Sequence, residues 1–338
     1  MTQFWTLSFP LPGTPERTAR RAEERGWDGL LFTDSQNFNG DCYSALAIAS
    51  KATARIGLGT GVTNPYTRHA AVTASAIATI QVESQGRAVL GIGRGDSSLA
   101  NLGLPPAPAS TLESYLTQVQ AYLRGEAVEH NGHRAPIRWI VERQVAKVPV
   151  DVAATGPRVT EIAGRLADMV TLAVGADTAR LAAGVERARA ARAASGGDAA
   201  GLGVGAYLNI AAHSDPSIAR QAALGGVGTA AHFSGMAEGS LAQLSADDRR
   251  IVEAVTAAYE LGRHGDSRGS HLEHLSDDFV ARFAIVGSPA ECADRLGVLL
   301  DHVPLDRVVI MTGSRGVDPT ILDEVSAAVV EEVVAAVR

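Results

Sequence analysis

Residues 89–96, Val89-Leu90-Gly91-Ile92-Gly93-Arg94-Gly95-Asp96, join a short apolar run to a charged turn with glycine at alternate positions. The apolar half predicts a buried strand, and the glycines predict the turn that ends it. Glycine tolerates positive φ and lets a flat ligand approach the backbone. The dinucleotide fingerprint GxGxxG is not met, because Asp96 stands where its third glycine would fall. The stretch therefore predicts a strand that delivers polar groups to a site other than an NAD site; the alternative is an ordinary turn in which Asp96 caps the next helix.

Strands and helices are expected to alternate along the chain. The expected strands are 4–9, 29–33, 56–62, 87–93, 148–154, 169–173, 203–212 and 307–312. The expected helices are 15–25, 41–54, 68–84, 112–123, 155–166, 177–194, 290–302 and 319–337. This order predicts a parallel (β/α)8 barrel in one domain over 1–338, with a doubly wound open sheet as the alternative. Segment 217–274 is too long for a crossover, so a mostly helical insertion is expected before the last strand.

Composition narrows the class of protein. The 338 residues are 46% hydrophobic, with 35 glycines and 14 prolines, which is typical of a compact globular protein. The net charge of −7 favours neither nucleic acid nor anionic lipid as a partner. Cys42 and Cys292 suit a reducing compartment, and neither a signal peptide nor a membrane span is evident. A soluble cytoplasmic protein is expected.

Polar residues follow several of the expected strands. Asp34 and Ser35, Asn64, Asp96, and residues 155–158 each come directly after a strand. Barrel enzymes keep their functional loops at these ends, so the four loops are expected to line one pocket. Glycines also crowd the neighbouring strand 56–62, where they would open a slot for a planar ring; the alternative is that they relieve crowding inside the barrel.

Thr155-Gly156-Pro157-Arg158 opens a helix with proline at a position suited to the first turn. Exposed amides and the helix dipole favour an anion there, so a phosphate is the natural ligand. The alternative is simple capping by Thr155.

Other candidates are weaker. His264, His271 and His274 lie near Asp266 and Glu273, but their spacing matches no metal motif and no metal is expected. Arg68 and His69 begin an expected helix, and we expect them to make structural hydrogen bonds rather than to take part in catalysis. Neither a Ser-His-Asp order, a P-loop nor a CxxC motif is evident.

The chain resembles the bacterial-luciferase-like superfamily, and within it the deazaflavin-dependent branch typified by methylenetetrahydromethanopterin reductase. The residues that carry the resemblance are GTGVTNPYTRH at 59–69, ESQGRAVLGIGRGD at 83–96, ATGPR at 154–158 followed by GRLADMV, and FAIVGSPAEC at 283–292. They occur in the family's order over nearly the whole chain. The resemblance implies a barrel with an insertion, a homodimer, and coenzyme F420, an 8-hydroxy-5-deazaflavin, bound at the C-terminal ends of the strands.

The resemblance also assigns roles to particular residues. The Gly61–Val62 bond would be a non-prolyl cis peptide behind the deazaflavin ring. Asp34 and Asn64 would contact the ring or its polyol chain. The pocket around the ring would also include Arg94, Gly95 and Asp96. The cofactor phosphate would be held by the backbone of Thr155, Gly156, Pro157, Arg158 and Val159.

One departure from the family concerns the acid or base of the reaction. Some relatives carry histidine directly after the acid at position 34, whereas this chain has Ser35. Asp96 then becomes the candidate proton donor, with Ser35 as the second catalytic candidate; the alternative role of Asp96 is a cap or a cofactor contact.

These roles imply a hydride-transfer oxidoreductase that uses F420 and a small-molecule substrate. Two alternatives stay open: an FMN-dependent monooxygenase, and a flavin-binding protein without turnover if the insertion blocks the pocket.

Overall fold

A closed barrel forms the centre of the molecule in the computed structural model, which describes residues 1–237 and 239–338. Eight parallel strands of this described part pair in sequence order, and the last pairs back with the first. They are β1 (Gln3–Ser8), β2 (Gly29–Phe32), β3 (Gly57–Thr60), β4 (Ala88–Ile92), β7 (Val150–Ala154), β8 (Met169–Leu172), β9 (Gly203–Ala212) and β11 (Arg307–Met311). The predicted (β/α)8 barrel is confirmed, and closure of the sheet excludes the open doubly wound alternative.

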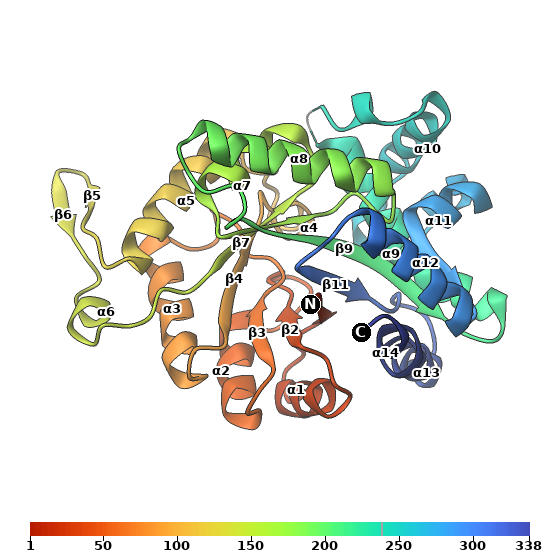
Figure 1. The fold of residues 1–338 in the computed structure, drawn as a ribbon, viewed down its shortest axis with the longest axis horizontal. Coiled ribbons are helices and arrows are strands. Elements are labelled where there is room, and N and C mark those ends of the chain that lie inside the picture. The colour runs from red at the N-terminus through yellow and green to blue at the C-terminus, as the bar shows by residue number, and fades with distance from the viewer. Residues whose placement is uncertain (238) are drawn as a thin grey trace.

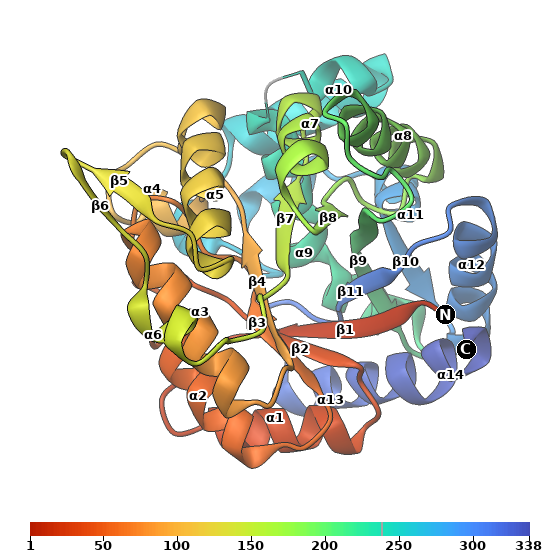
Figure 2. The ribbon, with the colours of Figure 1, turned by 60° about the vertical axis from the view of Figure 1, so that its left-hand side comes forward.

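Helices surround the barrel, as Figures 1 and 2 show from two directions. They are α1 (Pro15–Glu24), α2 (Cys42–Ala52), α3 (Ala70–Glu83), α4 (Ser97–Ala100), α5 (Ala109–Leu123), α6 (Arg138–Glu142), α7 (Pro157–Leu166), α8 (Thr178–Ala194), α12 (Pro289–His302), α13 (Pro319–Ala328), the π-helical η4 (Val329–Val334) and α14 (Ala335–Val337). A helix on the outside of a barrel is apolar on the side that packs against the strands and polar on the side that faces water. Most expected helices differ from these bounds by one to three residues at an end.

The segment between β9 and β11 contains the expected insertion. It comprises α9 (Pro216–Met236), η1 (Leu241–Gln243), α10 (Ala246–Ala257), η2 (Leu261–Arg263), η3 (Ser270–His274), α11 (Asp277–Phe283) and β10 (Ala284–Gly287). Its apolar side chains form a second hydrophobic cluster around Phe279 and Phe283. In Figure 1 this segment lies beyond β9, with α10 and α11 on the right. It therefore lies where it can cover one end of the barrel.

The sequence did not predict three strands. β10 pairs with the C-terminal half of β9, from Ala284 opposite Asn209 to Gly287 opposite Ala212. β5 (Val128–His130) and β6 (His133–Ala135) form a small antiparallel hairpin that projects from the body in Figures 1 and 2. All three strands are only three or four residues long and lack a clear period-two pattern, which explains why none of them is among the expected strands.

The N-terminal end of the barrel is filled by side chains. The Trp5 indole lies so close to Gly29 that a Cβ added there would be 1.9 Å from the ring. Arg307 lies over the same indole at 4.0 Å and pairs with buried Asp151 at 3.2 Å. This leaves the opposite end of the barrel, where the strands terminate, as the candidate site.

Glycines of β3 and β4 make room for the protein itself. A Cβ at Gly91 would lie 2.0 Å from the Thr60 carbonyl oxygen, and one at Gly93 would lie 3.1 Å from Val62 Cγ2. A Cβ at Gly61 would lie 2.4 Å from Leu7 Cδ1. These directions are occupied by neighbouring protein atoms, which supports the alternative that the glycines relieve crowding inside the barrel.

Gly91→Ala is expected to destabilise the protein by about 1–3 kcal/mol, because the added methyl forces β3 and β4 apart. Urea unfolding measures the loss. Gly262→Ala is the matched control, since no described atom lies within 4 Å of its Cβ position and its φ is not positive. Equal stability of the two variants would contradict this packing.

Candidate functional site

The loop after β2 is held by a buried network around Asp34. Its carboxylate accepts hydrogen bonds from Thr63 Oγ1 at 2.7 Å and from Gln36 Nε2 at 2.7 Å, and it forms an ion pair with Arg68 at 2.9 Å. Arg68 also pairs with Asp41 and lies over the Tyr43 ring. Asp34 is 3% exposed. The oxygens of Asp34 are therefore engaged by protein donors, and Arg68 makes hydrogen bonds of the structural kind expected for it.

The loop after β3 continues this network. The Gly61–Val62 peptide bond is cis, as the resemblance implied. Asn64 is fully buried, its Oδ1 accepts the amides of Tyr66 and Thr67, and its Nδ2 lies 3.5 Å from Ser98 Oγ. Through these contacts the structure brings the ends of β2, β3 and β4 together, as expected.

Asp96 stands at the start of α4 with its carboxyl group buried on one side. It occupies the N-cap position of α4 without making a side-chain cap bond, and its Oδ2 has no hydrogen-bond partner within the described part of the chain. The side chain is 18% exposed. Burial raises the pKa of Asp96 to about 7, opposed by the positive charge of Arg94. A carboxyl group that ionises near neutral pH, with one oxygen unbonded, has the properties of a general acid.

Asp96→Asn is expected to make the protein more stable at pH 8 by up to about 4 kcal/mol, because three pKa units correspond to that free energy. Between the unfolded pKa near 4 and the native value of about 7, the native state keeps a proton that the unfolded state has lost. Stability of the wild type therefore falls as pH rises through this window, whereas asparagine stays neutral in both states. Urea unfolding at pH 5 and pH 8 measures the difference, which should shrink at pH 5. Exposed Asp301→Asn is the control; the same response from both variants would contradict the burial of Asp96.

Aromatic and histidine side chains of the insertion lie against Asp96. His232 of α9 places its Nε2 3.8 Å from Asp96 Oδ1. The His232 ring stacks on Tyr259, with centroids 3.7 Å apart and an interplanar angle of 1°. Tyr259 Oη lies 2.7 Å from His264 Nδ1, and His264 Nε2 lies 3.3 Å from Ser97 Oγ. Sequence reasoning missed His232 and Tyr259, since nothing in the spacing of the insertion relates them to residue 96.

The remaining predicted residues surround this centre. Ser35 is half-buried, and its carbonyl accepts the amides of Phe38 and Asn39. Arg94 donates from Nε to the Ala107 carbonyl at 2.6 Å, and Gly95 has a φ of +73°. None of the described contacts joins Ser35 to Asp96.

The start of α7 follows β7, the barrel neighbour of β4. Gly156 is its N-cap residue, and the described structure shows no side-chain cap, so the capping role considered for Thr155 is wrong. Pro157 occupies the first turn, and a Cβ at Gly239 of the insertion would lie 3.0 Å from the proline ring. Val159 is buried, and Arg158 follows the proline at the same helix start. The segment 155–159 thus lies at the same end of the barrel as Asp96.

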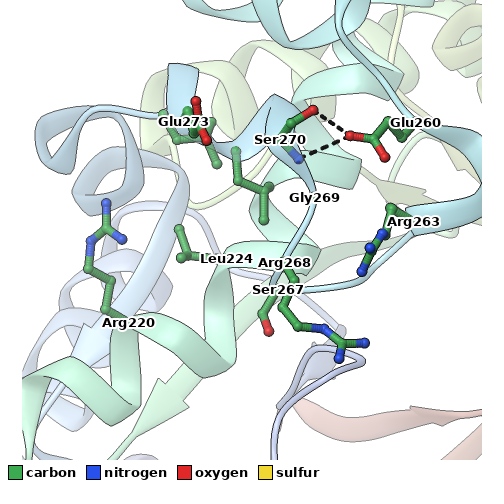
Figure 3. A pocket seen from close by; sticks show the side chains of 11 residues that line it. Arg220, Leu224, Glu260, Arg263, Ser267, Arg268, Gly269, Ser270 and Glu273 are labelled. Carbon is green, nitrogen blue, oxygen red and sulfur yellow. Dashed lines mark hydrogen bonds between the residues drawn. The ribbon is translucent and has the colours of Figure 1, made fainter.

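A hollow of about 620 Å³ lies elsewhere, inside the insertion (Figure 3). Leu224 and Leu272 contribute apolar walls, and arginines stand at its rim. Arg268 is bonded to Asp266, and Arg220 pairs with Asp277, so their charges are already balanced. This hollow is not the site formed by the strand ends.

Comparisons with known proteins agree with the fold. The family model described as luciferase-like monooxygenase matches residues 13–302. The chain belongs to the luciferase-like monooxygenase family. It is 31% identical over 292 residues to the 5,10-methylenetetrahydromethanopterin reductase of Methanolobus tindarius, covering 84% of this chain and 85% of the relative. It is 35% identical over 162 residues to the F420-dependent glucose-6-phosphate dehydrogenase of Beutenbergia cavernae, covering 44% of this chain and 48% of the relative.

A solved luciferase-like structure shows the same fold. The coenzyme F420-dependent tetrahydromethanopterin reductase of Methanopyrus kandleri superimposes with a TM-score of 0.76 at 23% identity, covering 100% of this chain and 99% of the other. Among the described residues of this family member, no group of three or more metal-ligating side chains could hold a metal ion. None of its described helices is long and apolar enough to cross a membrane.

Proposed function

We propose that this luciferase-like protein is an oxidoreductase that transfers a hydride between coenzyme F420 and a small organic substrate. A relative that is similar over most of the chain is named as a reductase. Another, similar over nearly half of the chain, is named as an F420-dependent dehydrogenase. The observation that carries the proposal is the carboxyl group of Asp96 at the strand ends, whose pKa is raised to about 7 by burial. Hydride transfer to a polarised double bond also needs a proton, which such a group can supply.

The residues at the strand ends fit a cofactor that has both a planar ring and a phosphate. Asp96 Oδ2 and His232 Nδ1 are buried polar atoms without a partner among the described residues, which supports a polar ligand at this site. The uncapped start of α7 offers backbone amides and a helix dipole to a phosphate. We assign the ring to the surface formed by Gly61, Val62, Asn64 and 94–96, and the phosphate to 155–159. Asp34 acts from behind this surface, through Thr63 and Arg68.

When bound, reduced F420 supplies the hydride. Residues 94–96 would hold the acceptor with its heteroatom toward Asp96. As the carbon gains the hydride, the heteroatom takes the proton from Asp96, whose carboxyl group becomes a carboxylate. The insertion approaches the strand ends through His232 and His264, and in this proposal it limits the access of water to the reacting atoms.

The alternative function is an FMN-dependent monooxygenase, favoured by the name of the matching family model. Reduced flavin activates oxygen, whereas a 5-deazaflavin does not. The other alternative expected from the sequence, a flavin-binding protein without turnover, receives less support because the named relatives are enzymes.

Titration of the purified protein with F420 and with FMN, followed by fluorescence, tests the proposal. We expect saturable binding of F420 and weak binding of FMN, and we expect an F420-loaded sample to oxidise or reduce a panel of carbonyl and imine compounds. Tight FMN binding without F420 binding would overturn the proposal. The homodimer and the cytoplasmic location stay predictions, which sedimentation and cell fractionation would measure.

A further inference from the structure

His232 and Asp96 face one another with complementary polar atoms. Nε2 of His232 lies 3.8 Å from Oδ1 of Asp96, and their side chains are 12% and 18% exposed. The outer atoms, His232 Nδ1 and Asp96 Oδ2, are buried and have no partner among the described residues. A gap of 3.8 Å is longer than a hydrogen bond, but a small side-chain rotation in the protein without ligand would close it.

Two structural features fix the position of the His232 ring. Its face is stacked on Tyr259, and the Tyr259 hydroxyl is held by His264 at 2.7 Å and by Thr229 at 3.3 Å. His264 returns to Ser97, the residue next to Asp96. His232 is thus connected through Tyr259 and His264 to Ser97, the neighbour of Asp96 in the chain. These contacts set the distance between the imidazole and the carboxyl group.

The charges around the pair favour a neutral imidazole. Burial, together with a smaller effect of nearby His271, lowers the pKa of His232 to about 4, so His232 is uncharged at neutral pH. The other titratable groups near the pair are Arg94, Tyr259 and His264; burial lowers the pKa of His264 to about 4 and raises that of Tyr259. A neutral imidazole that carries its hydrogen on Nε2 is a donor toward Oδ1.

We propose that His232 is the positioning residue of Asp96: its Nε2–H holds Oδ1, so that Oδ2 carries the proton delivered to the substrate. The inference rests on the proposed function for the use of that proton. When the proton leaves Oδ2 for the substrate heteroatom, the negative charge remains on the carboxylate. The Nε2–H group then donates to an anion, which makes the hydrogen bond stronger and the carboxyl group a better acid.

Loss of this donor should raise the pKa of Asp96. His232→Phe keeps a ring on Tyr259 but has no nitrogen, and we expect it to raise the pKa of Asp96 by about 1–2 units, since a hydrogen bond to a charged group has about that worth. His232→Gln places an amide N–H near the Nε2 position and should restore most of the original value. The measurement is a pH titration of aspartate-labelled protein by ¹³C NMR, with the Asp96 signal identified by its absence from Asp96→Asn.

His213→Phe is the matched control. His213 Nε2 also lies 3.8 Å from a carboxylate, that of Glu324, but Glu324 is 60% exposed and belongs to another part of the molecule. This variant should leave the Asp96 titration unchanged. An unchanged pKa of Asp96 in His232→Phe, or an equal shift in the control, would overturn the inference. The NMR titration needs no coenzyme, so F420 binding measured on the same samples tests the proposed function separately.

Discussion

Asp96→Asn is expected to slow hydride transfer from reduced F420 by about 100- to 10,000-fold, the range that a general acid contributes. Asparagine keeps the shape of the side chain but cannot release a proton to the acceptor. Burial gives the Asp96 carboxyl group a pKa of about 7, so the wild type holds a large protonated fraction at neutral pH. The reappearance of oxidised F420 absorbance in a single turnover measures the rate.

The rate of hydride transfer by the wild type should depend on pH in a direction set by the protonation of Asp96. Because the protonated carboxyl group is the active form, the wild-type rate should fall as pH rises above about 7. Asp96→Asn should lose this dependence when it is saturated with F420. A variant that retains more than a third of the wild-type rate would show that Asp96 only contacts the cofactor.

Arg68→Met is expected to destabilise the protein by about 3–5 kcal/mol, because it leaves the carboxylate of Asp34 buried without its counter-charge. Asp34 is 3% exposed, and Arg68 approaches both of its oxygens, at 2.9 and 3.2 Å. The same guanidinium also links the loop after β2 to Asp41 at the start of α2. Urea unfolding measures the loss.

Two variants make the test of this ion pair specific. Combining Asp34→Leu with Arg68→Met should recover part of the lost stability, since neither charge is then buried alone. Arg20→Met removes an exposed ion pair with Glu16 and should cost less than about 1 kcal/mol. Equal effects of Arg68→Met and Arg20→Met would contradict the burial of the Asp34 network.

Much of the fold could be predicted from the sequence because each barrel strand is an apolar run bounded by turn residues. The expected strand at 203–212 coincides with β9, and the expected strand at 87–93 differs from β4 by one residue at each end. The helix expected from 68 begins instead at Ala70, because His69 accepts the Ala71 amide and caps it. Local capping chemistry of this kind decides helix ends and is difficult to infer from periodicity.

The site was harder to predict because its parts come from distant segments. Polar residues after β2, β3 and β4 were expected to meet, and hydrogen bonds between Asp34 and Thr63 and the 3.5 Å contact of Asn64 with Ser98 bring them together. His232 lies 136 positions from Asp96, and only the packing of α9 over the barrel brings the two within 3.8 Å. Such a contact leaves no local pattern in the sequence.

The role of glycine is difficult to infer for a related reason. Alternation of glycine in 89–96 suggests an opening for a ligand, but Cβ atoms added at Gly91 and Gly93 would meet Thr60 of β3 and Val62, which follows that strand. A single sequence shows that a position lacks a side chain. It does not show whether a ligand or the protein occupies the space.

A crystal structure of the protein with F420 tests the central claim most directly. We expect the deazaflavin ring to lie against the Gly61–Val62 peptide and the coenzyme phosphate to lie at the amides that begin α7. We expect Asp96 Oδ2 to face the substrate side of the ring. A coenzyme whose phosphate lies away from 155–159, or whose ring lies remote from Asp96, would contradict it.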